Sequence, residues 1–326
     1  MGRLLEGKAA LVTGGGRGLG RSHALALAQA GAAVLVNDLG GDIRGEGARD
    51  PAPADKVAAE IRDAGGRALA DAGNVADWES ARQMVERAVA EFGGLDIVVN
   101  NAGICRFATL DAMAPKDWDL QIAVNLTGTA AVSHWAARYW RAHGARPGRA
   151  IINTSSPAGT NPVAGSPAYC ASKAAVAALT VAAATELAEL GVRVNAVAPM
   201  ARTRMTLAVA AHDEVMKAVA SGFDRVAPEQ VSPLVVYLAS VHCRFTGRVF
   251  GIEGDDLFLF EGWSAEHHFN NGRRTWTVEE LARALAHVDR QDHGYYIAPS
   301  KRVAGPSPSD EALALLERAS TTDSNK

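Results

Sequence analysis

Two residues whose types and spacing suit proton transfer, Tyr169 and Lys173, stand four positions apart in the stretch 168-AYCASKAAVAALT-180. The alanines, valine and leucine that follow predict a helix, and positions i and i+4 lie on one face of a helix. A tyrosine with its ordinary pKa of about 10 is a poor base at neutral pH, but a nearby ammonium group favours tyrosinate and lowers that pKa. The pair therefore fits acid–base work on a hydroxyl group, although an aromatic ring packed on a lysine stem has the same spacing.

A glycine-rich turn near the N-terminus, 13-TGGGRGLG-20, follows an apolar run at 9–13 and precedes a helical pattern at 20–30. Glycines permit a tight turn and let backbone N–H groups approach a pyrophosphate. The N-terminus of the following helix favours an anion. A strand before the turn and a helix after it are the context that a dinucleotide site requires, so we predict such a site here rather than a plain loop.

Asp38 follows the second apolar run, 33–37, and lies eighteen positions beyond Gly20. An acidic residue at this place binds the ribose hydroxyls of NAD, and its charge repels the 2′-phosphate of NADP. Arg17 in the glycine turn indicates the opposite preference, because a guanidinium group could pair with that phosphate. The strand end lies against the ribose, where a charge clash is costly, so we predict NAD as the cofactor.

The elements that would position these residues alternate along the chain. Apolar runs predict strands at 9–13, 33–37, 67–70, 95–99, 149–154 and 192–197 and a last strand with its exit at 246–260, and helical patterns cover 20–30, 55–64, 78–92, 115–124 continuing into 127–143, and 167–190. Strands that are apolar on both faces are typical of a parallel sheet covered by helices on both sides. Right-handed crossovers then give a doubly wound α/β fold, and we expect a Rossmann-type domain over residues 1–260.

Two stretches interrupt this alternation. The segment 39–55 is rich in glycine, proline and charge and is longer than a usual strand–helix connection, so it is expected to be a surface loop, either solvated or folded over a ligand. Residues 261–303 are expected to form a C-terminal extension, in which Thr277 and Glu280 have the spacing of a capping box that begins a helix. The polar residues 304–326 are expected to form a flexible tail.

Composition excludes several classes of protein. The 326-residue chain is 48% hydrophobic and 21% charged, which is typical of a soluble globular protein, and a net charge of −3 favours neither nucleic acid nor an anionic membrane as a partner. No apolar run reaches the length of about 18 residues that a transmembrane helix needs. Cys105, Cys170 and Cys243 lack metal-ligand or redox-pair spacing and fit a reducing cytoplasm. We predict no metal site.

These motifs, in this order, resemble the short-chain dehydrogenase/reductase family over about residues 5–255. The glycine turn is similar to the family's glycine signature, and 100-NNAG-103 is similar to its next motif. VN at 124–125 matches the position of its asparagine, Ser156 has the family's spacing of thirteen residues before the tyrosine, and Tyr169 with Lys173 matches the YxxxK motif. The resemblance implies a Rossmann fold, a nicotinamide cofactor and hydride transfer to or from a secondary alcohol.

The resemblance also implies a catalytic set of Asn125, Ser156, Tyr169 and Lys173. Tyr169 takes the hydroxyl proton in oxidation and returns it in reduction, and Ser156 hydrogen-bonds the substrate oxygen. Lys173 binds the nicotinamide ribose, and Asn125 holds a water molecule that links Lys173 to solvent. Ser155 competes with Ser156 for its role, and the spacing favours Ser156.

The predicted cofactor-binding residues come from the glycine turn and from the ends of the following strands. They are Gly14, Arg17, Gly18, Leu19, Gly20, Asp38, Asn74, Val75, Asn101, Ala102, Gly103, Tyr169, Lys173, Pro199 and Thr203. Met200 stands near the place of the family's usual glycine after the proline, which is a departure from its pattern. Residues 205–222 are expected to form lid helices over the substrate.

The stretch 34-VLVNDLGGDIRGEG-47 and the long loop after it are similar to one branch of the family. That branch contains the (3R)-hydroxyacyl-CoA dehydrogenase part of the peroxisomal D-specific multifunctional enzyme and NAD-dependent bacterial relatives. The resemblance implies a 3-hydroxyacyl-CoA or another bulky secondary alcohol as substrate, and a homotetramer in the cytoplasm. A steroid or general alcohol dehydrogenase without CoA, or a non-catalytic dinucleotide sensor, are the alternatives. Arg44, Arg49 and Lys56 would meet CoA phosphates or belong to a solvated loop.

Overall fold

The computed structural model describes residues 4–47, 49–208, 216–217, 222–262, 268–273 and 275–286. Most of the expected lid, residues 205–222, and all of the expected tail, residues 304–326, lie outside the described residues. The expected boundaries at residues 260 and 303 stay predictions.

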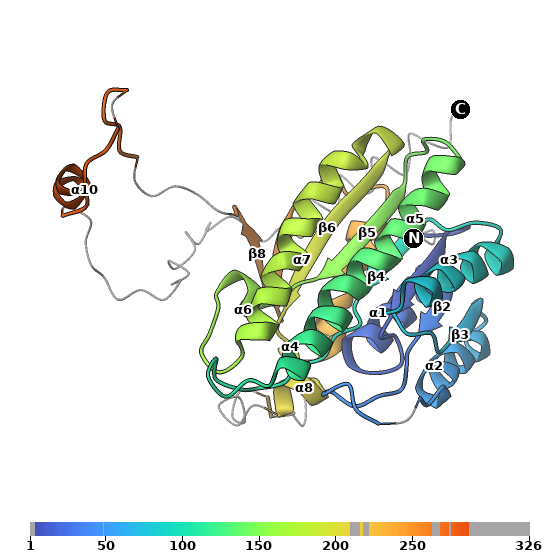
Figure 1. The fold of residues 1–326 in the computed structure, drawn as a ribbon. Coiled ribbons are helices and arrows are strands. Elements are labelled where there is room, and N and C mark those ends of the chain that lie inside the picture. Colours follow the sequence, from blue (N-terminus) through green and yellow to red (C-terminus); the bar gives the residue numbers. More distant parts are fainter. Residues whose placement is uncertain are drawn as a thin grey trace. The chain divides into compact units, whose positions relative to one another are not determined.

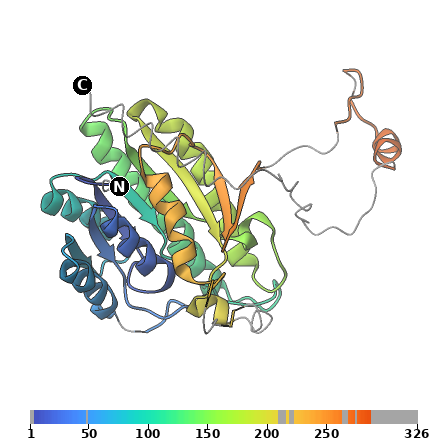
Figure 2. The same ribbon diagram turned by 180° about the vertical axis from the view of Figure 1, so that it is seen from behind.

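The eight described strands form one sheet with the order β3-β2-β1-β4-β5-β6-β7-β8 (Figures 1 and 2). Their bounds are β1 Ala9–Thr13, β2 Ala33–Asn37, β3 Ala68–Asp71, β4 Ile97–Asn100, β5 Arg149–Thr154, β6 Val192–Pro199, β7 Val249–Glu253 and β8 Asp256–Phe260. The first seven are parallel, as predicted, but β8 pairs antiparallel with β7. Gly254, with φ +59°, begins the two-residue turn that folds the chain back, so the single last strand expected at 246–260 is a hairpin.

Helices cover both faces of this sheet. The described helices of the chain are α1 Gly18–Gln29, α2 Ala52–Asp63, α3 Trp78–Phe92, α4 Pro115–Ile122, α5 Gly128–Ala142, α6 Pro157–Thr160, α7 Pro167–Glu186, α8 Arg204–Leu207, α9 Ser232–Ala239 and α10 Val278–Leu285, with short 3₁₀ turns at Ala188–Leu190 and Pro228–Gln230. Helix α10 begins at the predicted capping box of Thr277 and Glu280.

Alternation along the strands divides the core into two main clusters. In β1, Ala10 and Val12 belong to one cluster and Leu11 to the other, because successive side chains of a strand point to opposite faces. Helices α1, α2 and α9 pack on the first face, and α3, α5 and α7 pack on the second (Figures 1 and 2). The doubly wound Rossmann fold expected from the sequence is therefore confirmed.

The helix expected to run through Asn125 contains a π-helical turn. This turn, Ala123–Thr127, joins α4 to α5 and places Asn125 at its centre, where the residue is 0% exposed. Widened turns of this kind are rare inside α-helices and are frequent at functional sites. The local distortion is therefore the first structural sign that Asn125 has more than a packing role.

Candidate active site

The predicted site residues meet at the carboxyl edge of the parallel strands. The glycine turn follows β1, Asp38 follows β2, Asn101 to Gly103 follow β4, and Ser156 follows β5. The order of strands reverses between β1 and β4, which lie side by side although β2 and β3 come between them in sequence. Ligands of open α/β sheets bind in the crevice at such a reversal, so the topology gathers residues that lie far apart in the chain.

The glycine turn leaves no room for side chains. A Cβ atom on Gly20 would lie 2.0 Å from the carbonyl oxygen of Gly14, and Gly14 itself has φ +61°. The amide of Asn101 donates to the carbonyl oxygens of Thr13 and Gly14 at 3.1 and 3.0 Å, which ties this turn to the end of β4. The result is a cradle of backbone at the N-terminus of α1, and it fits the pyrophosphate of a dinucleotide.

Thr13 is a site residue that the sequence analysis missed. Its hydroxyl oxygen accepts hydrogen bonds from the backbone N–H groups of both Asn101 and Ala102, each at 3.1 Å. These bonds join the ends of β1 and β4 beside the cradle. The T of TGGGRGLG was available as a signal, but only the pairing of the two strands shows what its hydroxyl reaches.

Asp38 supports the first turn of the cradle and the loop that follows it. Its Oδ2 accepts from the N–H of Gly16 at 2.9 Å, and its Oδ1 accepts from the N–H of Gly40 at 2.8 Å. Arg17 points to the same loop and donates to the carbonyl oxygens of Gly40 and Gly41 at 3.3 and 3.1 Å. The carboxylate therefore lies beside the cradle, and the guanidinium that could receive a 2′-phosphate is engaged by backbone.

Lys173 and Tyr169 share one face of α7, as their spacing predicts. The Nζ atom of Lys173 donates to the carbonyl oxygen of Thr154 at 2.8 Å and lies 5.8 Å from the centroid of the Tyr169 ring. Burial lowers the pKa of Lys173 to about 8. Burial also raises the pKa of Tyr169, and the hydrogen bond with Ser156 acts in the other direction. The lowering expected from the neighbouring ammonium is therefore not found in this structure.

The two candidate serines have different surroundings. The hydroxyl of Ser155 donates to the backbone carbonyl of Lys173 at 2.8 Å, and Ser155 is 1% exposed. The hydroxyl of Ser156 accepts from the N–H of Ala158 at 3.1 Å and interacts with Tyr169, where it opposes the rise in the tyrosine pKa. The Ser155 hydroxyl thus connects the end of β5 to α7, whereas Ser156 is the serine that interacts with Tyr169.

The side-chain amide of Asn125 accepts one hydrogen bond and donates two. Its Oδ1 accepts from the N–H of Ile104 at 2.8 Å, while its Nδ2 donates to the carbonyl of Ile104 at 3.0 Å and to the hydroxyl of Ser172 at 3.1 Å. A Cβ atom on Gly103 would lie 3.3 Å from both Asn125 Oδ1 and Lys173 Nζ. Because Gly103 has no side chain, the amide of Asn125 and the ammonium group of Lys173 both reach the space beside its Cα atom.

The remaining predicted cofactor residues contact different parts of the fold. Thr203 caps α8 and lies against Gly18, since a Cβ atom there would meet its Cγ2 at 3.5 Å. Val75 packs on Gly128 at the start of α5, whereas Asn74 is exposed and caps its own turn through the N–H of Ala76. Leu19 packs against the core beneath α1, and Pro199 ends β6. The N–H of Met200 donates to the carbonyl oxygen of Ile252 at 2.9 Å, which extends the pairing of β6 with β7 by one residue.

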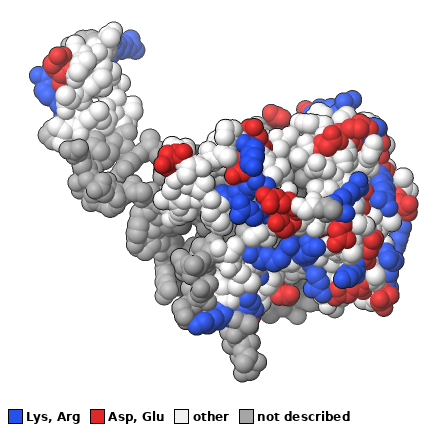
Figure 3. Space-filling model, turned by 60° about the horizontal axis from the view of Figure 1, so that its bottom comes forward, with Lys and Arg blue, Asp and Glu red and all other residues white. Residues whose placement is uncertain are grey.

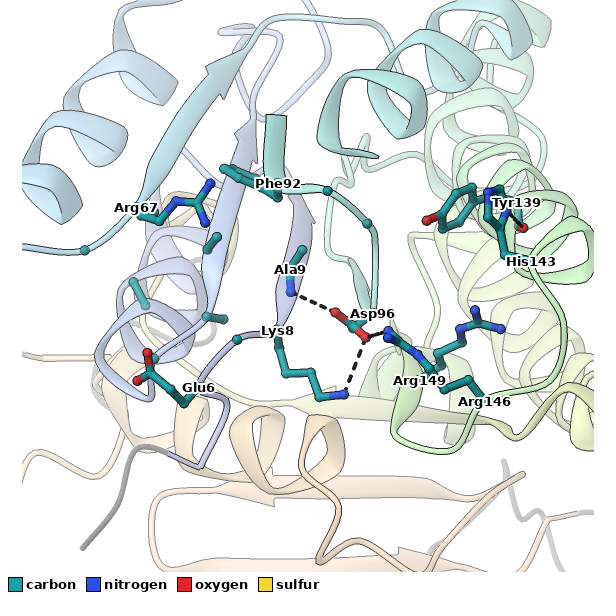
Figure 4. A pocket seen from close by; sticks show the side chains of 18 of the residues that line it. Glu6, Lys8, Ala9, Arg67, Phe92, Asp96, Tyr139, His143, Arg146 and Arg149 are labelled. Atoms are coloured by element: carbon teal, nitrogen blue, oxygen red, sulfur yellow. Dashed lines mark hydrogen bonds and ion pairs between the residues drawn. The ribbon is translucent and has the colours of Figure 1, made fainter. Parts of the chain in front are cut away.

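A second hollow of about 540 Å³ lies at the opposite, amino edge of the sheet (Figure 4). Helices α1, α2, α3 and α5 end at this hollow, and helix C-termini attract cations. The basic side chains that line it are therefore explained by the helix ends and do not indicate a ligand site. Arg67 donates to the carbonyl of Glu91 at 3.2 Å, Arg149 donates to that of Gly144 at 2.7 Å, and Lys8 and Arg146 pair with Asp96. The predicted site residues do not line this hollow, which we assign to stabilising the fold.

The geometry at the carboxyl edge suits a nicotinamide dinucleotide and an alcohol or ketone. The cradle is made of backbone, Asp38 lies beside it, and Tyr169 with Ser156 offers two hydroxyl groups near the Lys173 ammonium. When bound, a nicotinamide cofactor supplies the hydride chemistry, and the protein supplies orientation and proton transfer.

Comparison with known proteins agrees with this geometry. The sequence profile of the short chain dehydrogenase family matches residues 8–214. Hydroxyacyl-CoA dehydrogenase ChsB1 of Mycobacterium tuberculosis is 39% identical over 289 residues, which cover 86% of this chain and 88% of that protein. Peroxisomal multifunctional enzyme type 2 of Mus musculus is 39% identical over 247 residues, which cover 76% of this chain but only 32% of that enzyme.

A solved structure gives the same result. The crystal structure of a short chain dehydrogenase from Mycobacterium avium superimposes with a TM-score of 0.76 at 43% identity, covering 87% of this chain and 94% of that one. The resemblance stated from the motifs is thus confirmed. The chain belongs to the short-chain dehydrogenase/reductase family and is an oxidoreductase that acts on CH–OH groups.

Proposed function

We propose that this protein is an NAD-dependent dehydrogenase that interconverts a 3-hydroxyacyl-CoA thioester and its 3-ketoacyl-CoA. The observation that carries the reaction type is the placement of Tyr169, Ser156 and Lys173 together at the end of β5 and the start of α7, next to the glycine cradle. The glycine cradle alone has no group that could exchange a proton with the hydroxyl group of a substrate, whereas this cluster supplies one.

The residues divide the proton transfer among them. Protonated Tyr169, the form that burial favours, donates its proton to a carbonyl oxygen during reduction. Oxidation requires tyrosinate, which the Lys173 ammonium stabilises through its charge. Ser156 donates a hydrogen bond to the substrate oxygen and holds it near Tyr169. Asn125 and Lys173 flank Gly103, where one water molecule between them would return protons from solvent.

The preference for NAD rests on Asp38. Its carboxylate is held beside the cradle by the N–H groups of Gly16 and Gly40, and a fixed negative charge there repels a 2′-phosphate. Arg17 donates to two loop carbonyls instead of facing open solvent. Binding NADP would therefore have to overcome the carboxylate, and the Arg17 guanidinium is already engaged by backbone.

The acyl-CoA assignment rests on the relatives and on the 39–47 loop. The M. tuberculosis relative is a hydroxyacyl-CoA dehydrogenase, and it matches this chain over nearly its full length. The side chain of Arg44 on the loop is 58% exposed, and basic side chains lie among acidic ones on the face of the molecule that Figure 3 shows. We infer that a CoA phosphate meets this loop, while a substrate without CoA would use only the inner crevice.

A homotetramer in the cytoplasm completes the proposal. The outward face of α7 is apolar, with Ala171, Ala178, Val181 and Ala182 exposed. By length and composition alone α7 could also cross a membrane, but its opposite face packs into the core and carries Lys173. A flat face of small residues suits packing against the same helix of another subunit.

The test is NAD and NADP reduction with paired alcohols, followed at the nicotinamide absorbance. The panel sets 3-hydroxyacyl-CoA thioesters of several chain lengths against hydroxysteroids and simple secondary alcohols. We expect turnover of the thioesters with NAD and at least about tenfold lower kcat/KM with NADP. Turnover of CoA-free alcohols alone would move the protein to the steroid or general alcohol alternative, and dinucleotide binding with no turnover at all would favour a sensor.

A further inference from the structure

The 39–47 loop, Leu39–Gly47, is fastened by one buried arginine. The side chain of Arg106 is 9% exposed and reaches the loop from the segment that follows β4. Its Nε donates to the carbonyl oxygen of Arg44 at 2.7 Å, and its Nη2 pairs with Glu46 at 3.2 Å. Its Nη1 donates to Asp117 on α4 at 2.5 Å. One guanidinium group therefore joins three parts of the chain.

Backbone contacts support the same junction. The N–H of Cys105 donates to the carbonyl of Ile43 at 3.0 Å. A Cβ atom on Gly45 would lie 3.0 Å from Ile104 and 3.2 Å from Leu120, so the loop rests directly on both side chains. Ile104 is also the residue whose N–H and carbonyl are paired with the amide of Asn125. The loop tip is thus one residue away from a member of the predicted catalytic set.

The other end of the loop touches the dinucleotide cradle. The N–H of Gly40 donates to Asp38, and the carbonyl oxygens of Gly40 and Gly41 accept from Arg17. A loop fixed at its tip keeps these carbonyls and this N–H in place. A loop released at its tip lets Asp38 lose one of its two backbone partners and frees Arg17 to turn.

We propose that Arg106 is a positioning residue that latches the 39–47 loop over the segment 104–106 and thereby holds Asp38 in its dinucleotide-binding position. Arg106 touches neither the cradle nor Tyr169 in this role; it acts through the loop. The shape of its contacts requires a guanidinium group, because three acceptors lie in different directions around one planar fork. A lysine has a single terminal nitrogen and would satisfy only part of the set.

The inference rests on the dinucleotide site but not on the identity of the substrate, so it is tested without turnover. NADH and NADPH are titrated into the wild type, Arg106→Met, Arg106→Lys and Arg82→Met, with binding followed by nicotinamide fluorescence. Arg82→Met is the matched control, since Arg82 pairs with Glu79 and Glu86 on the exposed surface of α3. In parallel, the folded proteins are treated with trypsin, and cleavage after Arg44 is followed by mass spectrometry.

The tryptic readout reports on the latch itself, because the carbonyl that trypsin attacks at Arg44 is the one that Arg106 Nε binds. We expect Arg106→Met to weaken binding of the preferred dinucleotide by about five- to tenfold and to speed cleavage after Arg44 by at least about tenfold. Arg106→Lys is expected to fall between the wild type and Arg106→Met, and Arg82→Met to match the wild type.

Unchanged binding and unchanged cleavage in Arg106→Met would overturn the proposal. Faster cleavage with unchanged binding would overturn the positioning role, because the loop would then be free without effect on Asp38. If Arg106→Met does not fold, Gly45→Val carries the test from the exposed side of the junction, since Gly45 has φ +76° and its added side chain would collide with Ile104. It must give the same two changes. A wild type that binds neither dinucleotide refutes the proposed function, and the cleavage rates still decide the latch.

Discussion

Lys173 places its ammonium group 5.8 Å from the ring centroid of Tyr169 while donating a hydrogen bond to the carbonyl of Thr154 at 2.8 Å. The carbonyl fixes the lysine, and the lysine in turn sets the charge beside the tyrosine. Burial acts on the two groups in opposite directions, lowering the pKa of Lys173 to about 8 and raising that of Tyr169, because it disfavours the charged form of each.

Replacing Tyr169 with phenylalanine removes the proton-transferring hydroxyl and keeps the ring. We expect kcat to fall by about 10²- to 10⁴-fold, with NADH binding within about twofold of the wild type. Steady-state kinetics and fluorescence titration measure the two quantities. Retention of full activity in Tyr169→Phe would refute the acid–base role.

The two serines give a matched comparison in the same assay. Ser156→Ala removes the hydroxyl that interacts with Tyr169 and is expected to lower kcat by about 10²-fold. Ser155→Ala removes a buried bond to the Lys173 carbonyl and is expected to lower the free energy of unfolding by about 1 kcal/mol with a smaller loss of kcat. The reverse ranking of the two kcat values would assign the substrate contact to Ser155.

The lowered pKa of Lys173 predicts how stability depends on pH. The unfolded chain holds this proton up to its ordinary pKa of 10.5, whereas the folded protein releases it near pH 8. Between these values the unfolded state binds more protons, so the free energy of unfolding rises with pH, by at most about 1.4 kcal/mol per pH unit from this one group. Below pH 8 the contribution is constant.

Urea unfolding of the wild type and Lys173→Met at pH 7.5 and pH 9 isolates this effect. The difference in unfolding free energy between wild type and variant should increase in favour of the wild type over this interval. Subtraction removes groups that do not interact with Lys173. The Cys105 thiol does interact with Lys173, but its raised pKa acts in the opposite sense and chiefly above pH 9. A difference that stays constant would mean that Lys173 is charged in the fold throughout this range.

Replacing Asp38 with asparagine should change the choice of cofactor. The amide oxygen can still accept one backbone N–H, but the charge that repels a 2′-phosphate is gone. We expect the ratio of kcat/KM for NAD to that for NADP to fall by about ten- to a hundredfold. Glu79→Gln is the control, because Glu79 pairs with Arg82 on the exposed surface of α3. An unchanged ratio in Asp38→Asn would place the discrimination elsewhere.

Asp96 at the amino edge tests the structural role of the second hollow (Figure 4). Its side chain is 5% exposed; it accepts from the N–H of Ala9 at 3.0 Å and pairs with Lys8 and Arg146. Asp96→Asn is expected to lower the free energy of unfolding by about 2–3 kcal/mol and to leave KM for NAD unchanged. The exposed pair member Glu79 gives the control, since Glu79→Gln should cost less than about 0.5 kcal/mol. A changed KM for NAD in Asp96→Asn would contradict a purely structural role, because it would mean that the amino edge of the sheet affects cofactor binding at the carboxyl edge.

The sequence by itself determined the features that depend on near neighbours in the chain. Apolar runs and helical patterns predicted the parallel strands and most of the helices, because burial on both faces leaves no polar positions in a central strand. The i, i+4 spacing predicted that Tyr169 and Lys173 share a face, and the glycines predicted the cradle. No helix was predicted in the segment 223–245, although α9 lies there and covers one face of the core.

Only the tertiary structure decided what depends on distant neighbours. The pairing of β8 with β7 is antiparallel. The hydrogen bond that the Asn101 N–H donates to the Thr13 hydroxyl and the one that Arg106 donates to the Arg44 carbonyl join residues far apart in the sequence, at separations that no helix or strand period predicts. The direction of the Tyr169 pKa shift also needed the fold, since only packing shows that burial raises this pKa although an ammonium group lies nearby. The local sequence pattern specifies the backbone conformation of an element and the side on which each residue lies. Desolvation and long-range hydrogen bonds, in contrast, depend on the arrangement of the whole chain.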